Sequence, residues 1–266
     1  MPLPPVVNFL GNQFIELQSI DSTNNYAFAQ IHANLAHPGT CYFAHEQTAG
    51  KGQRGKSWDT QKGANIIFSI VLKPLFLQPF QQFYLSACVA VATCQFLDKY
   101  ATGAVRIKWP NDLYWQDKKL GGILIENIIG GMSDDRWQKK EEEQGSNWKW
   151  AIVGIGINVN QINFPPDLRN PVSLRQISGQ YFNTMQLAKE LCKTIDHFYN
   201  QLMNYGPVSI FETYNRVLYK KNEVVKFKKD NRNFEATVKS VSQTGQLTVQ
   251  HGVEEKFDFG EVEWLL

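Results

Sequence analysis

The chain has 266 residues, of which 43% are hydrophobic and 20% charged, the balance expected of a protein with a packed core. Its net charge of +2 is too mild to indicate nucleic-acid binding by itself. No segment approaches the roughly 18 continuous apolar residues of a membrane span, and the amino terminus lacks the basic region of a signal peptide. The four cysteines show no C-x-x-C spacing, so we expect reduced core residues of a cytoplasmic protein.

The apolar pattern predicts alternating strands and helices over most of the chain. In chain order, we expect a strand at 13–20, a helix at 21–35, strands at 40–46 and 64–73, a helix at 85–96, strands at 105–109, 121–129 and 148–158, and helices at 187–202 and 211–218. Residues 64–73 are apolar on both faces, which favours a central strand. Residues 130–147 are polar and highly charged, and we expect them to form an exposed hairpin tip.

The pattern changes near residue 220. Short alternating segments follow at 224–227, 234–238 and 247–249, with turn residues between them. This spacing is typical of a small β-barrel. We therefore predict an α+β protein with two domains, at residues 1–219 and 220–266.

A stretch from Gly50 to Trp58 stands out, with three glycines and three cations before the tryptophan. Glycines let backbone N–H groups approach an anion closely, and lysine and arginine supply the charge that phosphate requires. The alternative interpretation is an exposed, flexible basic loop.

Two polar stretches precede this loop in the sequence. Ser22, Thr23 and Asn24 suit a helix cap, or a cluster of small groups that binds a polar ligand head. Gln47 ends a predicted strand, and in a pocket its amide offers both a donor and an acceptor to a cyclic urea or amide.

Lys108 precedes a turn made of Trp109, Pro110, Asn111 and Asp112. A lysine opposite an apolar strand face is usually solvated. Here the proline stiffens the turn, and Asn or Asp side chains bond neighbouring backbone or a metal, so the turn favours a cation held in a defined place.

Glycines interrupt two apolar strands, at Gly121 and Gly122 and at Gly154 and Gly156. Such glycines weaken a strand unless something approaches the backbone, although a bulge or tight packing also accounts for them. Two such strands favour a ligand that lies across the sheet. No G-x-G-x-x-G opens a helix, so this is not a dinucleotide fingerprint.

Taken together, these motifs resemble those of biotin–protein ligases, in the family's order over roughly residues 15–160. They are Ser22–Asn24, Gln47–Gly55, Lys108–Leu113, Lys119–Glu126 and Gly154–Asn158. The carboxy-terminal barrel matches in kind, and the chain is similar to the short form without a DNA-binding domain. The resemblance implies a mixed sheet with flanking helices, related to class II aminoacyl-tRNA synthetases, followed by a src-homology-3-like β-barrel.

The resemblance also implies a reaction. Biotin and ATP, with Mg²⁺, form biotinyl-AMP, and the biotinyl group passes to a lysine of a biotin carboxyl carrier protein or domain. Lys108 and Arg54 are the implied catalytic residues. The implied biotin contacts are Ser22, Thr23, Asn24, Gln47, Gly50, Lys51, Gly52, Gln53, Lys108, Gly121 and Gly122. The implied ATP contacts are Lys51, Gln53, Arg54, Trp58, Lys108, Asn111 and Asn158, and Asp112 is the candidate metal ligand. For Trp58, core packing is an equal alternative.

The glycine loop departs from the family pattern, which is richer in arginine. Lys51, Gln53 and Lys56 stand where arginines are usual. An arginine grips phosphate with two bonds, a lysine acts as a point charge, and a glutamine carries no charge. We therefore expect a looser hold on the adenylate.

Three further expectations concern partners and rival functions. Because catalytic elements begin by about residue 15, we expect no helix-turn-helix and no DNA partner. A homodimer and a monomer are both left open. The rival functions are a lipoate or octanoate ligase or transferase of the same superfamily, and a non-catalytic biotin-adenylate sensor or β-barrel interaction module.

Overall fold

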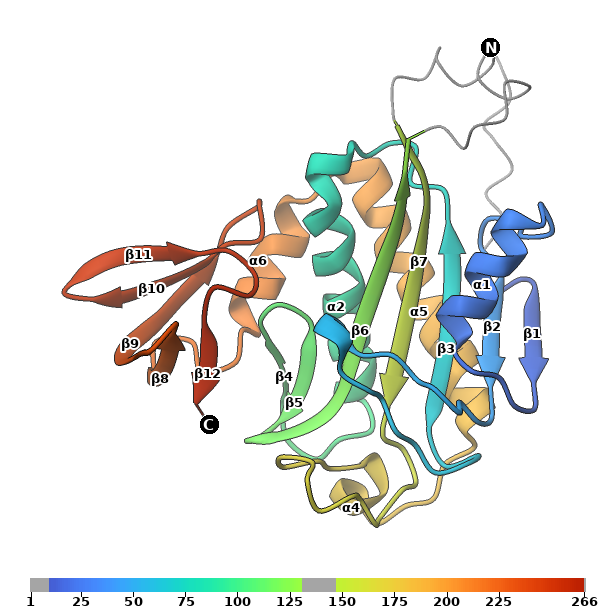
Figure 1. Cartoon of the computed structure of the whole chain (residues 1–266), viewed down its shortest axis with the longest axis horizontal. Helices are drawn as coiled ribbons and strands as arrows, with labels where there is room; N and C mark the ends of the chain where they lie inside the picture. Colours follow the sequence, from blue (N-terminus) through green and yellow to red (C-terminus); the bar gives the residue numbers. More distant parts are fainter. Residues whose placement is uncertain (1–9, 131–146, 266) are drawn as a thin grey trace. The chain divides into compact units, whose positions relative to one another are not determined.

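A computed structural model describes residues 10–130 and 147–265 of the chain (Figure 1). The helices are α1 (Thr23–His32), α2 (Gln82–Asp98), α4 (Leu174–Ser178), α5 (Thr184–Tyr205) and α6 (Val208–Arg216), with 3₁₀ turns η1 (Gln53–Gly55) and η2 (Pro79–Gln81). The strands are β1 (Phe14–Leu17), β2 (Cys41–Ala44), β3 (Ile66–Leu72), β4 (Val105–Lys108), β5 (Asp112–Trp115), β6 (Lys118–Ile129), β7 (Trp148–Ile157), β8 (Val224–Lys229), β9 (Arg232–Val241), β10 (Leu247–His251), β11 (Val253–Phe257) and β12 (Glu263–Leu265). Residues 131–146 of the predicted charged tip lie outside the described residues.

The chain divides into two compact units. The first draws on Met1–Pro79, Ile123–Gln161 and Tyr181–His197, and the second on Phe80–Gly122, Ile162–Gln180 and Phe198–Leu266. Two elements, β6 and α5, contribute residues to both units. The predicted boundary between residues 219 and 220 stays a prediction.

The first unit contains a mixed sheet in the order β1, β2, β3, β7, β6. β1 and β2 are parallel, whereas β2 with β3 and β3 with β7 are antiparallel. Every residue of β3 is buried, which confirms the central position predicted from its apolar sequence.

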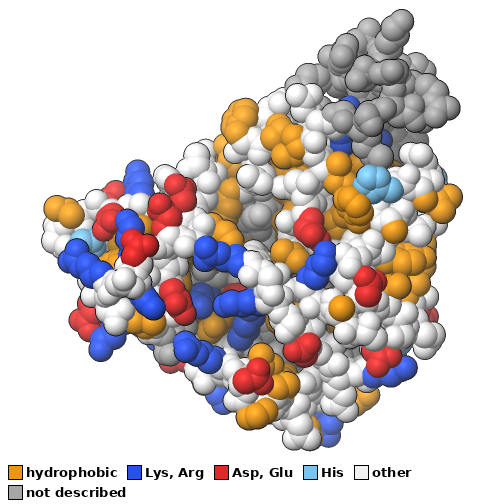
Figure 2. Space-filling view, viewed as in Figure 1, with side chains coloured by type: hydrophobic (Ala, Val, Ile, Leu, Met, Phe, Trp, Pro, Cys, Tyr) orange, Lys and Arg blue, Asp and Glu red, His pale blue; other side chains and the backbone are white. Residues whose placement is uncertain are grey.

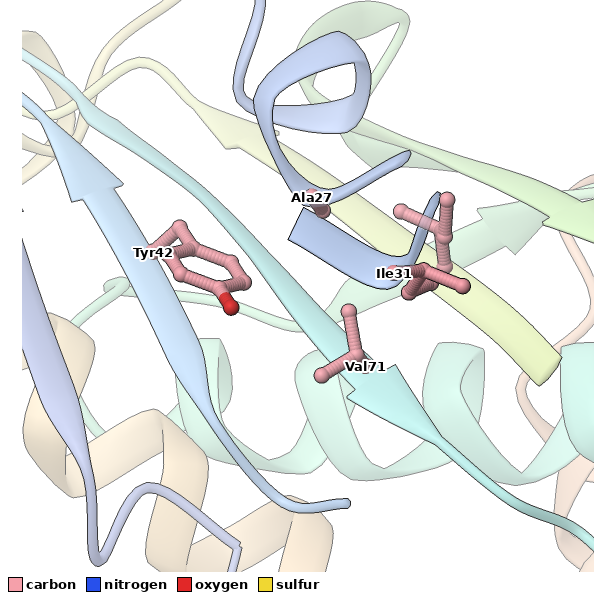
Figure 3. Packing of buried hydrophobic residues seen from close by; sticks show 5 residues of the cluster. Ala27, Ile31, Tyr42 and Val71 are labelled. Atoms are coloured by element: carbon pink, nitrogen blue, oxygen red, sulfur yellow. The ribbon is translucent and has the colours of Figure 1, made fainter. Parts of the chain in front are cut away.

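Helix α1 covers one face of this sheet (Figure 1). Ala27 and Ile31 of the helix pack with Tyr42, Val71 and Ile152 of three neighbouring strands, as Figure 3 shows. Successive strand residues point to opposite faces, so the residues two and four positions along β3 and β7 share the face that α1 covers. This face therefore continues from the apolar cluster towards the start of α1.

The opposite face of β2 carries Cys41, whose Sγ atom lies 3.8 Å from that of Cys192 in α5. All four cysteines are buried and free, as the sequence predicted. Burial raises the pKa of Cys94 to about 12, with a smaller contribution from Asp98. The Cys94 thiol is therefore a protonated core group rather than a nucleophile.

The second unit contains the first residues of β6 paired with β5, and β5 paired with β4, all antiparallel. It also contains a five-stranded antiparallel sheet in the order β11, β10, β9, β8, β12, which is the carboxy-terminal β domain expected from the sequence. The sequence pattern missed β5, β11, β12 and the short helix α4.

The turn between β4 and β5 is held from two elements of the second unit. The Trp109–Pro110 peptide bond is cis. The Trp109 indole donates to the Gly245 carbonyl oxygen at 2.8 Å, and the Tyr214 hydroxyl donates to the Pro110 carbonyl oxygen at 2.7 Å. The rigid turn predicted after Lys108 is therefore anchored by hydrogen bonds to distant parts of the sequence.

Acidic and basic side chains are interspersed on the molecular face seen in Figure 2, in keeping with the small net charge. None of the helices in the described ranges is long and apolar enough to cross a membrane.

Candidate functional site

The first group of predicted residues lies at the start of α1. Ser22, Thr23 and Asn24 are 2%, 3% and 4% exposed. Ser22 is the N-cap residue, in an extended conformation, but its side chain makes no capping hydrogen bond. Capping therefore does not account for the buried serine hydroxyl, and the alternative, that it binds a polar ligand, stays a prediction.

A hydrogen-bonded cluster surrounds Thr23. Gln47 Oε1 accepts from the Thr23 backbone N–H at 2.8 Å and lies 3.0 Å from Thr23 Oγ1. The Ser69 hydroxyl lies 2.7 Å from Thr23 Oγ1 and 2.6 Å from Asn24 Oδ1. The Thr23 and Ser69 hydroxyls have one proton each, but they take part in three close oxygen–oxygen contacts. Two protons cannot fill three contacts, so oxygen lone pairs of the cluster can still accept hydrogen bonds. Such a cluster suits a ligand that donates N–H groups.

The cluster continues to the glycine loop through Glu126 of β6. Asn24 Nδ2 donates to Glu126 Oε2 at 2.6 Å, and Lys51 Nζ lies 3.8 Å from Glu126 Oε1. A run of polar contacts therefore joins the predicted head-group residues to the first cation of the loop.

Backbone contacts close the base of the glycine loop. The Trp58 N–H donates to the Gly50 carbonyl oxygen at 2.9 Å, and the Gly52 N–H donates to the Lys56 carbonyl oxygen at 2.7 Å. At buried Gly50, a Cβ atom would lie 2.2 Å from the Trp58 carbonyl oxygen, so only glycine fits. The base of the loop is thus a tight backbone ladder.

The tip of the loop is the 3₁₀ turn η1, where Arg54 adopts φ 55° and ψ 41°. The side chains of Lys51, Arg54 and Lys56 are exposed, and Gln53 is half-buried. The cations therefore project to solvent from a fixed base, as a loop that recruits an anion requires.

Side chains of the first unit pack against two glycines of β7. A Cβ atom on Gly154 would lie 2.4 Å from Asn24 Oδ1, and one on Gly156 would lie 2.5 Å from Trp58 Cε2. The chain's own side chains pack against these glycines, as the tight-packing alternative expected, and a ligand that lies across the sheet stays a prediction. Trp58 is half-buried against Gly156, and Asn158 is buried just after β7.

In the second unit, Lys108 ends β4 and lies among aromatic rings. Its Nζ atom is 5.1 Å from the Tyr114 ring centroid and 5.8 Å from the Trp264 ring centroid. The sequence predicted that this lysine is held in a defined place, and both rings are within the range of cation–π attraction.

The other predicted residues of this unit lie beside it in the sheet. Asp112 pairs with Gly122 across β5 and β6, and its Oδ1 atom lies 2.7 Å from Lys119 Nζ. Asn111 and Gly121 are buried. A Cβ atom on Gly122 would lie 3.3 Å from Asp112 Oδ1, so the close-approach argument is weaker here than at Gly154.

Four residues of these clusters were given no role from the sequence: Ser69, Glu126, Tyr114 and Trp264. Ser69 had a usable signal, because it is the one polar residue in the apolar strand Ile66–Leu72. The contact between Lys108 and Trp264 joins residues far apart in the chain, and no local pattern indicates it.

The family comparison covers the part of the chain that carries most of these motifs. Residues 16–136 match the model of the biotin/lipoate A/B protein ligase family. This segment is similar to biotin/lipoate A/B protein ligase domains. The match supports the resemblance drawn from the motifs, and its description covers both biotin and lipoate enzymes.

Curated relatives are similar at moderate identity. The bifunctional ligase/repressor BirA of Bacillus spizizenii is 34% identical over 201 residues, which are 74% of this chain and 57% of the relative. The biotin–[acetyl-CoA-carboxylase] ligase of Paracoccus denitrificans is 30% identical over 61% of this chain and 64% of the relative. The chain spans about half the length of the BirA relatives.

The fold is that of solved biotin protein ligases. The enzyme from Aquifex aeolicus, in complex with biotin and ATP, superimposes with a TM-score of 0.75 over 96% of this chain and 99% of its own, at 24% identity. The predicted α+β fold with a mixed sheet and a carboxy-terminal β domain is therefore confirmed.

Proposed function

We propose that the chain is an ATP-dependent biotin–protein ligase. The observation that carries the proposal is the run of polar contacts from Gln47 through Thr23, Ser69, Asn24 and Glu126 to Lys51. A cluster suited to a cyclic urea, joined by these contacts to a loop suited to an anion, supports this function. A biotin molecule carries both groups, a ureido ring at one end and a carboxylate at the other.

The reaction proceeds in two steps. The biotin carboxylate attacks the α-phosphorus of ATP, and the bond to pyrophosphate breaks, giving biotinyl-AMP. The ε-amine of a carrier lysine then attacks the acyl carbon, loses a proton and releases AMP. In the first step two anions meet, so fixed N–H dipoles and cations must offset their repulsion.

Residues of the first unit bind biotin and the adenylate. Ser22, Thr23, Asn24 and Gln47 bond the ring head, with Thr23 and Ser69 oxygens accepting from its N–H groups. The loop from Gly50 to Gln53 wraps the carboxylate and the α-phosphate. Arg54 and Lys51 supply charge, while Trp58 and Asn158 contact the adenosine.

Further proposed roles belong to residues of the second unit. Lys108 polarises the carboxylate and phosphate during adenylation and stabilises the departing phosphate afterwards. Gly121 and Gly122 give the biotin tail room, and Asn111 contacts the nucleotide.

Magnesium is a proposed part of the ATP substrate. Mg²⁺ in such sites is held by substrate phosphates with one or two carboxylates. Among the described residues no group of three or more His, Cys, Asp or Glu side chains is placed for a metal. Asp112 fits the smaller donor set as a single carboxylate, although Lys119 already lies 2.7 Å from its Oδ1 atom.

The proposed partner is the biotin carboxyl carrier protein or domain of a carboxylase. The name of the Paracoccus denitrificans relative supports this partner class. The proposed location is the cytoplasm, and the proposal holds for a monomer or a homodimer.

The test is biotin-dependent exchange of labelled pyrophosphate into ATP by the purified chain. Lys108→Ala should reduce exchange by roughly 100-fold or more, because it removes a cation from the charge-developing centre. Lys118→Ala is the matched control, since Lys118 is exposed at the start of β6. It should retain full exchange.

Two outcomes would overturn the proposal. Exchange that depends on octanoate or lipoate and not on biotin would assign the rival reaction that the family description also covers. Tight binding of biotin without any exchange would assign the rival function of a sensor.

A further inference from the structure

The ammonium of Lys108 lies against two aromatic rings from different sheets of the second unit. Tyr114 belongs to β5 and its ring centroid is 5.1 Å from Lys108 Nζ. Trp264 belongs to β12, in the carboxy-terminal sheet, and its centroid is 5.8 Å from the same atom. The carboxy-terminal sheet therefore contacts the lysine to which we assign the adenylation chemistry.

These rings are fixed by their own neighbours. Tyr114 and Trp264 are 8% and 7% exposed. Tyr219 bridges them, with centroid distances of 5.0 Å to Tyr114 and 6.0 Å to Trp264, and Phe227 lies 5.0 Å from Trp264. A cation held by such a cluster has little freedom to move.

Holding a cation by rings differs from holding it by a carboxylate. A ring face attracts the ammonium through its quadrupole but carries no net charge. Burial, helped by Asp112 and Asp117, raises the pKa of Tyr114, so this ring stays neutral at physiological pH. The rings can thus help to fix the position of Lys108 without adding a negative charge beside it.

The indole of Trp264 acts here through its face. Its N–H is buried and has no hydrogen-bond partner within the described ranges. A buried donor without a partner destabilises the fold, and phenylalanine would avoid that penalty. Indole is, however, the side chain with the strongest cation–π attraction.

We propose that Trp264 is a positioning residue for Lys108, by which the carboxy-terminal sheet holds the catalytic ammonium in place for adenylation. This inference rests on the proposed function. The Tyr114 ring contacts the same ammonium from strand β5.

The first experiment compares Trp264→Leu with Trp264→Phe in biotin-dependent pyrophosphate exchange. Leucine removes the ring, so kcat should fall by about 5- to 10-fold while the KM for biotin changes by less than about 2-fold. Phenylalanine retains a ring face and should restore kcat to within about 2-fold. If Trp264 only stabilised the fold, the loss of kcat would instead follow the loss of melting temperature from one variant to the next.

The matched control is Phe257→Leu. Phe257 is a fully buried ring of the same carboxy-terminal sheet, and it holds a different lysine, with Lys229 Nζ 4.8 Å from its centroid. This variant loses a comparable ring, so it reports the effect of weakening the sheet. Its kcat should stay within about 2-fold of the unaltered chain.

The second experiment needs no activity. Lysines are reductively methylated with ¹³C-formaldehyde and a borane reductant, and the Lys108 signal is assigned by its loss in Lys108→Arg. The Trp264 ring should shift this signal by its ring current, so Trp264→Leu should move the signal and Phe257→Leu should not.

The outcomes separate this inference from the proposed function. A Lys108 signal that ignores Trp264→Leu overturns the inference, as does a moved signal with unchanged kcat in an active chain. If the unaltered chain shows no exchange with biotin, the proposed function fails and takes the adenylation role of Trp264 with it, whereas the methyl signal still decides whether Trp264 holds Lys108.

Discussion

The glycine loop of the first unit and the Lys108 site of the second both present cations, but they hold them in opposite ways. In the loop, the backbone is fixed and the side chains project to solvent: Lys51 is 43% exposed and lies 3.8 Å from Glu126. At the Lys108 site, the side chain itself is fixed, because two buried rings lie within 6 Å of its ammonium.

This difference matches two tasks. A loop with exposed cations on a closed base can adapt to an arriving anion and later release it, since its side chains pay little to rearrange. A lysine that lies among rings is more restricted, and under the proposed function we expect it to meet the reacting atoms in one geometry, which favours the transition state. Under the proposed function, we therefore expect the loop to determine binding and release, and Lys108 to determine the rate of the chemical step.

The largest expected effect on the loop comes from Gly50→Ala. The new Cβ would lie 2.2 Å from the Trp58 carbonyl oxygen, so the base of the loop must open. Overpacking of this kind is unfavourable by about 1–3 kcal/mol, and we expect biotin-dependent exchange to fall by roughly 10- to 100-fold.

Gly55→Asn is the control for that change. Gly55 has φ 74°, a conformation that asparagine tolerates, and a Cβ there meets nothing within 4 Å. Exchange should stay within about 3-fold of the unaltered chain. Equal losses in both variants would show that the loop needs glycine for flexibility rather than for close packing at its base.

A smaller effect is expected from Gln53→Arg, which restores an arginine usual in the family loop. A guanidinium adds a charged, two-bond contact to phosphate, so biotinyl-adenylate should dissociate about 5-fold more slowly. The measurement is the release rate of adenylate formed on the enzyme. Gln180→Arg, at an exposed position in the second unit, adds the same charge and should leave that rate unchanged; an unchanged rate in Gln53→Arg would refute the looser hold.

The smallest effect is expected from Glu126→Gln. The Lys51–Glu126 pair is long at 3.8 Å and about 40% exposed on both sides, so its loss should change stability by less than about 1 kcal/mol. Removal of a negative charge beside the anion loop should lower the KM for ATP about 2-fold at low salt, and added salt should erase the difference. A higher KM would mean that Glu126 orients Lys51 productively.

The sequence indicated the parts of the fold that have long or strongly patterned segments. β3 was placed centrally because all its positions but Ser69 are apolar, and the start of α1 followed from polar residues of the types usual at a helix start. β5 was missed because it is only four residues long and lies between two turns. β11 is mostly exposed, so it lacks the apolar alternation that marks a strand.

The candidate site was predictable where the sequence carries residue types that are unusual for their secondary structure. Glycines inside strands at Gly154 and Gly156 indicated close approach, and the structure shows which groups approach them. The pairing of Lys108 with Trp264 was not predictable, because tertiary packing brings together residues 156 positions apart that lie in strands without any shared motif.

The two glycines of β7 also set a fixed length. Gly154 and Gly156 pair with Ser69 and Ile67 of β3, so they lie on one face, about 7 Å apart by the rise of a strand. Asn24 packs on Gly154 and Trp58 on Gly156. The spacing between these two contacts is therefore determined by the backbone repeat of the strand rather than by any side chain. Substitution of Asn24 or Trp58 changes the side chain that packs on each glycine but not the distance between the two glycines. A slip of β7 by one residue would instead turn both glycines to the opposite face of the sheet. We therefore expect the spacing of Asn24 and Trp58 to be the feature of this face that substitutions alter least.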